Sequence, residues 1–139
     1  MSHLNFILSF IIVFLPSELR REEARVNEYI SSVAPSEVVT ITTYSPTVEQ
    51  TDSTPLITAS GFKINESNPK RHRIIAVSRD LKRKYKFGTK LRIKGAGKYD
   101  GTYTVRDVMN KRYKKRIDIL VSKKDKQTKV KKVKVYKLK

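Results

Sequence analysis

The spacing of apolar residues changes along the chain and separates three kinds of segment. Residues 4–15 (LNFILSFIIVFL) are almost uniformly apolar, a length typical of the core of a secretory signal and short for a membrane span. Over residues 17–33 the apolar positions recur near helical spacing. We therefore expect a short amphipathic helix that begins after Ser17 and stops at the Ala34–Pro35 pair.

From residue 38 onward, short β-branched and aromatic runs replace the helical spacing. The runs are 38–44, 56–59, 74–77, 90–93, 103–105, 117–121 and 130–138. All five glycines fall between runs, where the chain turns. Six or seven short strands predict an all-β domain, either a small barrel or a sandwich, and residues 78–84 can add one helical turn. We divide the chain into a hydrophobic leader (1–16), a helical stalk or linker (17–37) and a β-domain (38–139).

The chain is strongly basic, with 31 Lys and Arg against 13 Asp and Glu and a net charge of +18. Residues 1–37 hold three Arg and five Glu, so the positive excess lies in the β-domain. Such a charge favours an anionic partner, namely nucleic acid, a membrane surface or a cell-wall polymer, although solubility is an equally good reason for it. There is no cysteine and there are two histidines, so we expect no metal site and no cofactor.

Two acids stand inside strand-like runs of this basic chain, Asp107 in TVRDV and Asp118 in RIDIL. Buried carboxylates need a partner or a task. One interpretation is catalysis, because two close carboxylates resist ionising together and one of them then keeps a proton near neutrality. Nearby arginines oppose this effect, so burial has to outweigh them. The other interpretation is that both acids are hydrogen-bonded or ion-paired and fix the loops of the domain.

Six strings occur in order along the β-domain: TITTYSP (40–46), TDSTPLITASG (51–61), IAVSRDL (75–81), FGTKLRI (87–93), GTYTVRD (101–107) and RIDIL (116–120). Together they resemble the 3D (three-aspartate) domain, which is related to the membrane-bound lytic transglycosylase A family and more distantly to rare lipoprotein A-like barrels. The resemblance covers residues 38–138. It implies a small double-psi β-barrel of six to seven strands.

The resemblance also implies an activity, cleavage of the MurNAc–GlcNAc bond of peptidoglycan with formation of a 1,6-anhydromuramyl end. The hydroxymethyl group of the sugar is the nucleophile in that reaction, so one carboxyl can act in turn as acid and base. The third and second family aspartates match Asp118 and Asp107, so we expect Asp118 to be the acid/base and Asp107 its partner. Ser78 occupies the first family position. Asp80 can take its place only if this segment is extended.

Further residues are candidates for binding the substrate: Tyr44, Asp52, Thr58, Ser60, Tyr113 and Arg116. Tyr44 can stack on a sugar ring or pack in the core. The polar side chains of Asp52, Thr58 and Ser60 can line a groove, but hydrogen bonding within the turn is their more common role. Tyr113 is a candidate only because it lies in the bulky, basic loop between the two aspartates.

Two hypotheses without catalysis remain open. A basic module can bind peptidoglycan through its stem-peptide carboxylates without cutting it, and high salt then releases it. Binding of nucleic acid needs only Lys and Arg against phosphate. It conflicts with the export-like leader and no recognition motif appears, so we expect no specific nucleic-acid partner. We expect an exported monomer, periplasmic or associated with the cell envelope, that binds peptidoglycan glycan strands and contacts the membrane through Leu4 to Leu15 if the leader stays uncleaved.

Overall fold

A computed structural model describes residues 3–47 and 53–139, with side chains described from residue 16 onward. The chain divides into two compact units, Met1–Ala34 and Pro35–Lys139. The first unit contains the helix α1 (His3–Ser32), which has Pro16 inside it. The predicted start after Ser17 is therefore wrong. Neither side of Pro16 holds a glycine and the residues after it, SELRREEAR, are rich in helix formers, so one proline does not end the helix.

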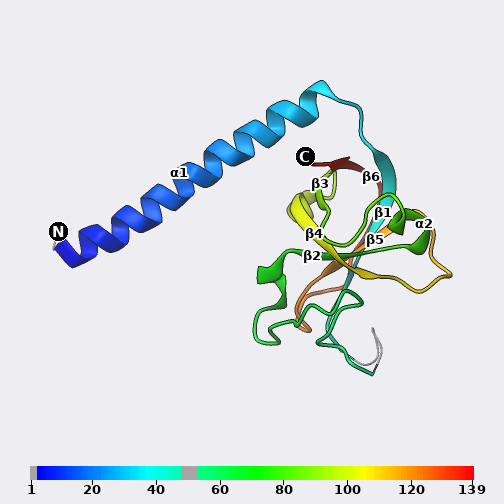
Figure 1. Ribbon diagram of the computed structural model, residues 1–139. Helices are drawn as coiled ribbons and strands as arrows, with labels where there is room; N and C mark the ends of the chain where they lie inside the picture. Colours follow the sequence, from blue (N-terminus) through cyan, green and yellow to red (C-terminus); the bar gives the residue numbers. More distant parts are fainter. Residues whose placement is uncertain (1–2, 48–52) are drawn as a thin grey trace. The chain divides into compact units, whose positions relative to one another are not determined.

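The second unit is a six-stranded barrel that closes on itself in the order β1-β5-β2-β4-β3-β6 (Figure 1). The strands are β1 (Glu37–Tyr44), β2 (Ile74–Val77), β3 (Lys90–Lys94), β4 (Gly101–Val108), β5 (Arg116–Leu120) and β6 (Lys129–Lys137). The β1–β5 and β2–β4 pairs are parallel, and the other neighbouring pairs are antiparallel. The predicted fold class is confirmed, because the protein is mostly β and has a closed mixed barrel and an N-terminal helix.

The strand predicted at residues 56–59 is absent, whereas the helical turn predicted after residue 77 is present. Residues 56–59 form no strand, and only an isolated bridge joins Ile57 to Lys63. The run is short and the chain turns at Gly61 (φ 86°), so no ladder can extend from it. The helical turn after β2 is confirmed as α2 (Arg79–Lys82). Two short 3₁₀ helices, η1 (Pro69–His72) and η2 (Gly97–Tyr99), complete the elements. Within the described residues, none of the helices is both long and apolar enough to cross a bilayer.

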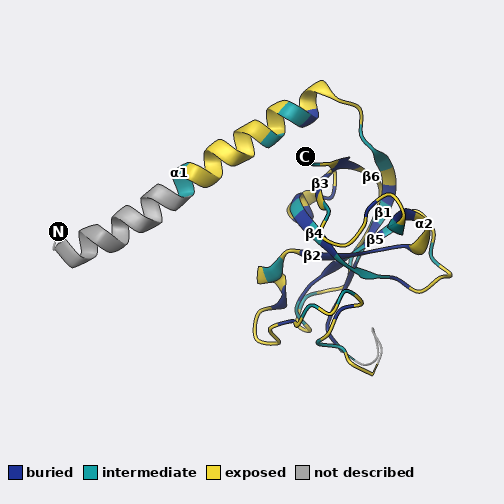
Figure 2. Cartoon of the chain, in the orientation of Figure 1, coloured by how far each residue is buried: buried dark blue, intermediate teal, exposed yellow. Residues whose placement is uncertain are grey.

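The barrel has an apolar interior because alternate residues of each strand point inward. Figure 2 shows buried residues concentrated on the barrel strands. The main cluster includes Ile41 on β1, Ile75 on β2, Ile117 on β5 and Val135 on β6, each 1% exposed or less. Residues between these positions therefore point to the outside of the barrel wall.

A second apolar cluster covers part of the outer wall. It consists of Tyr44, Ile64, Ile74, Ala76, Met109 and Leu120, with Leu56, Phe62 and Tyr113 packed against it. These residues come from the strands β1, β2 and β5 and from the loops that follow β1 and β4. The loops are thereby packed onto this face of the barrel, where the candidate site lies.

Candidate functional site

Four residues form a row across neighbouring strands on the outer face of the barrel. Thr42 on β1 pairs with Asp118 on β5, Asp118 pairs with Ala76 on β2, and Ala76 pairs with Asp107 on β4. Residues paired directly across strands point to the same face of a sheet. With about 4.8 Å between strands, the two aspartates start roughly 10 Å apart on the backbone. The small side chain of Ala76 leaves the space between them open.

A register shift in β4 places Asp107 in this row. Ile75 pairs with Val105, but Ala76 pairs with Asp107, so Arg106 is an extra residue in the ladder. Val105 is fully buried in the main core. Without the shift, Asp107 would follow it into the interior, because side chains two apart on a strand share a face. The bulge redirects the carboxylate to the outer face, as bulges beside functional sites often do.

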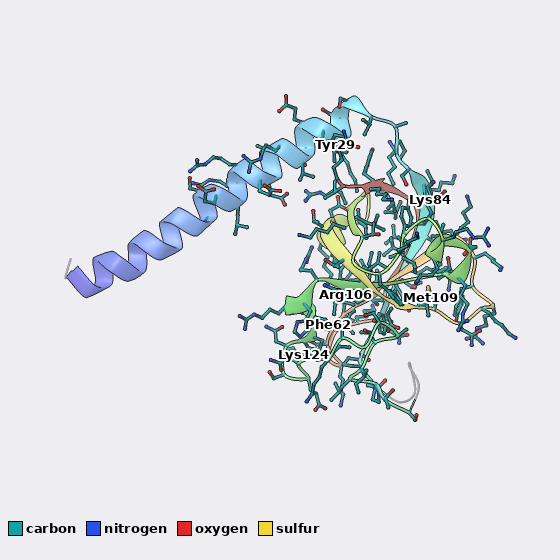
Figure 3. The ribbon with its side chains drawn as sticks, viewed as in Figure 1. Tyr29, Phe62, Lys84, Arg106, Met109 and Lys124 are labelled. Atoms are coloured by element: carbon teal, nitrogen blue, oxygen red, sulfur yellow. The ribbon has the colours of Figure 1, made fainter. Side chains whose placement is uncertain are left out.

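The row lines a cavity of about 590 Å³, within the size range of ligand sites. Pro55 and Ile57 contribute from the loop after β1, and Met109, labelled in Figure 3, contributes from the loop after β4. The polar lining also includes Thr43, Arg79, Asn110, Arg112, Tyr113, Arg116 and Gln127. The cavity therefore combines two acids with three arginines, a lining that can exchange a proton and bind an anionic or hydroxyl-rich ligand.

Several hydrogen-bond donors converge on Asp107. Its Oδ1 accepts from the backbone N–H of Ala59 at 2.9 Å and from its own neighbour Val108 at 3.0 Å. Its Oδ2 accepts from the hydroxyl of Tyr44 at 3.2 Å. Burial raises the pKa of Tyr44 well above its ordinary value, and the two aspartates add to this effect, so Tyr44 keeps its proton. An acceptor-only, ionised carboxylate fits these donors.

Asp118 has a different environment. The hydroxyl of Thr42 donates to its Oδ1 at 2.9 Å. Burial raises the pKa of Asp118 to about 6, although the Thr42 hydrogen bond and the Arg116 guanidinium act in the opposite direction. The charge of Asp107 makes only the smallest of these contributions. Burial therefore outweighs the opposing effect of Arg116 on the pKa of Asp118, as the catalytic interpretation of the sequence requires. Repulsion between the two aspartates is a minor cause.

Ser78 and Asp80 lie outside the cavity lining. Asp80 is on the helical turn α2, so the extended geometry that it needed to replace a family aspartate is absent from this segment. Its Oδ2 accepts from the backbone N–H of Lys115 at 3.0 Å. The hydroxyl oxygen of the buried Ser78 accepts from the N–H of Arg116 at 3.1 Å. Both side chains therefore fix the start of β5 and do not face the cavity.

The predicted substrate-binding residues divide into two groups. Tyr44, Tyr113 and Arg116 line the cavity. Thr58 and Ser60 do not: their hydroxyl oxygens lie 2.9 Å apart, and Thr58 also accepts from the N–H of Phe62 at 3.0 Å. They follow the common pattern of hydrogen bonding within a turn. Asp52 lies outside the described residues.

The structure adds site residues that the sequence interpretation missed. Thr42 and Ala76 complete the row, and Arg79 lines the cavity with its Nε donating to the carbonyl of Met109 at 3.2 Å. The outward position of Thr42, next to the core residue Ile41, was a usable signal. No sequence signal marked Arg79. In the described part of the chain, no three carboxylate or imidazole side chains lie close enough to hold a metal ion.

Comparisons with known proteins find no match for this chain among family models, curated proteins or solved structures. The function is therefore inferred from the residues of the cavity.

Proposed function

We propose that this protein cleaves the glycan strand of peptidoglycan as a lytic transglycosylase, with Asp118 as general acid and then general base. The observation that carries the proposal is the position of Asp118 in the cavity with its pKa raised to about 6. A pKa near the working pH suits a group that must both give and take a proton. The resemblance to the 3D domain and its double-psi barrel supports the same reaction, and a closed six-stranded mixed barrel is compatible with it.

In the proposed reaction, protonated Asp118 donates to the oxygen that links C1 of MurNAc to C4 of GlcNAc. The C1–O bond breaks, and GlcNAc leaves with a free 4-hydroxyl. The 6-hydroxyl of the same MurNAc then attacks C1, and the Asp118 carboxylate takes the proton of that hydroxyl. A C1–O6 bond forms, no water is consumed and Asp118 ends protonated again. Asp107, surrounded by donors, stabilises the positive charge that develops at C1.

The proposal includes a location and a partner. The apolar residues 4–15 fit an exported or envelope-associated protein, where peptidoglycan glycan strands are available. The net charge of +18 favours association with an acidic wall polymer.

The test is release of soluble muropeptides from purified sacculi, with the chain ends identified by mass spectrometry. The wild type should release anhydro ends, and Asp118→Asn should lower the rate roughly 10²- to 10⁴-fold, the usual contribution of a general acid/base. Asp125→Asn is the matched control, because it makes the same change at a residue outside the cavity lining. Unchanged release by Asp118→Asn would overturn the assignment, and reducing ends in place of anhydro ends would indicate hydrolysis.

A second candidate is binding of peptidoglycan without cleavage. The observation that favours it is the presence of three arginines in the cavity lining, which suits the carboxylates of stem peptides. This function predicts retention on sacculi at low salt, release at high salt and no soluble muropeptide, whether or not Asp118 is replaced.

A further inference from the structure

Three arginines from separate segments line the cavity together with Asp118. Arg79 is at the start of α2, Arg112 is in the loop after β4, and Arg116 begins β5. The ion pairs Lys70–Asp125, Lys84–Glu37 and Lys115–Glu37 of the barrel unit use other cations. The cavity lining holds three arginines against two aspartates, so positive charge is in excess there, and a negative ligand would reduce the repulsion among the arginines.

The loop between the two aspartates orients two of these arginines. The guanidinium carbon of Arg112 lies 4.8 Å from the ring centroid of Tyr113, and that of Arg116 lies 4.6 Å from it. Arg112 also donates an N–H to the Tyr113 hydroxyl at 2.7 Å. Stacking on an aromatic ring leaves the edge of a guanidinium, which carries its N–H groups, open to a ligand. The planar fork of such N–H groups matches a carboxylate.

We infer that Arg79, Arg112 and Arg116 form an anion subsite in the cavity wall, which binds a carboxylate carried by the sugar polymer beside the bond that Asp118 protonates. The arrangement of the three guanidinium groups supports the charge of the ligand. The choice of a carboxylate on a sugar rests on the proposed function, because the lactyl ether and the stem peptide of MurNAc are where that polymer carries carboxylates.

Occupation of this subsite has a consequence for catalysis. The positive charge of Arg116 lowers the pKa of Asp118. A bound carboxylate offsets that charge, so the proton on Asp118 becomes more stable when the substrate is in place. An acidic substrate thus raises the fraction of Asp118 that holds the proton needed for cleavage, whereas a neutral glycan of the same backbone does not.

The test compares two sugars by calorimetry with the full chain. MurNAc and GlcNAc differ only by the lactyl ether group at O3, which carries the carboxylate, and inorganic phosphate serves as an anion without a sugar. We expect MurNAc to bind the wild type roughly tenfold more tightly than GlcNAc, since a charged hydrogen-bond pair contributes that much. The preference should disappear in Arg112→Gln/Arg116→Gln. It should persist in Lys94→Gln/Lys134→Gln, which removes the same charge from β3 and β6, outside the cavity lining.

Two results would overturn the subsite: equal binding of both sugars, whether or not phosphate binds, or equal losses in the arginine and lysine variants. Circular dichroism checks folding, and Arg79→Gln, with an expected smaller loss of preference, serves if the double variant does not fold. These experiments can refute the subsite and the proposed cleavage independently of each other. A preference for MurNAc without release from sacculi refutes only the cleavage, and release without the preference refutes only the subsite.

Discussion

The two aspartates of the row on the outer face of the barrel have the same side chain in unlike surroundings. Asp107, on β4, accepts hydrogen bonds from Tyr44, Ala59 and Val108. Asp118, on β5, accepts from Thr42, and burial raises its pKa to about 6. Surroundings rich in donors stabilise a carboxylate, and burial with few donors favours the protonated acid. Position in the barrel, and not residue type, therefore decides whether burial or hydrogen-bond donors dominate the surroundings of each carboxyl group.

The position of each strand explains this difference. Asp118 lies within β5, which has β1 on one side and β2 on the other, so neighbouring backbone N–H groups are used in ladders. Asp107 lies near the end of β4, beyond the residues 101–104 that pair with β3. Backbone groups there face loops, and the N–H groups of Val108 and Ala59 bond the carboxylate.

The largest expected effect concerns the pH dependence of cleavage. The first step needs protonated Asp118, so kcat/KM should fall roughly tenfold for each pH unit above the pKa of Asp118. That pKa is about 6, which places the bend of the profile near pH 6. Initial rates on soluble glycan fragments between pH 5 and 8 measure the profile. A rate that stays constant across this range would show that Asp118 does not supply the proton.

The next prediction is that Asp118→Asn stabilises the fold at high pH while it lowers the rate of cleavage. The pKa of Asp118 is about 6 in the folded protein and 3.8 ordinarily, so the folded state binds more protons between these values and loses stability as pH rises through them. Above pH 6 the penalty is at most about 3 kcal/mol, and below pH 3.8 it vanishes. Urea unfolding at pH 8 and pH 3.5 should show stabilisation only at pH 8. Equal effects at both pH values would contradict the assignment.

The opposite sign is expected for Asp107→Asn. The amide places an N–H group where donors now point at a carboxylate oxygen, so the variant should lose about 1–3 kcal/mol of unfolding free energy at pH 7. The same urea experiment measures it. If both asparagine variants stabilise the protein equally, the surroundings of the two aspartates do not differ as described.

The smallest effect is expected for Thr42→Val. The variant removes the hydroxyl that donates to Asp118, which favours its ionised form, so the pKa of Asp118 should rise further. The bend in the pH profile should therefore move to higher pH, with a stability change of about 1 kcal/mol or less. Thr40→Val, at a position outside the cavity lining, is the matched control and should leave the bend in place. A bend that moves to lower pH would contradict the role of Thr42.

Much of the fold was predictable because alternation of apolar residues reports which side of a strand is buried. Ile117 and Ile119 point into the main core, so Asp118 between them had to point outward. The strand predicted at residues 56–59 was wrong because this run has the right composition but no neighbour to form a ladder with. The helix start was wrong because the proline signal at Pro16 competes with the strong helix formers that follow it.

The site was only partly predictable. The strings of the sequence brought Asp107 and Asp118 together, but the bulge at Arg106 leaves no trace in the apolar pattern. The role of Arg79 depends on where the loop after β4 places the carbonyl of Met109, a contact between segments far apart in the chain. Local patterns do not encode such contacts, because they form only when the loops pack on the outer wall.

The most direct test of the account is the titration of the Asp118 side chain itself. Carbon-detected NMR of the carboxyl groups in the full chain, with Asp118→Asn used to identify the signal, measures this value without any substrate. We expect an apparent pKa of about 6 for Asp118. A value close to the ordinary 3.8 would contradict it, because Asp118 would then hold no proton at neutral pH.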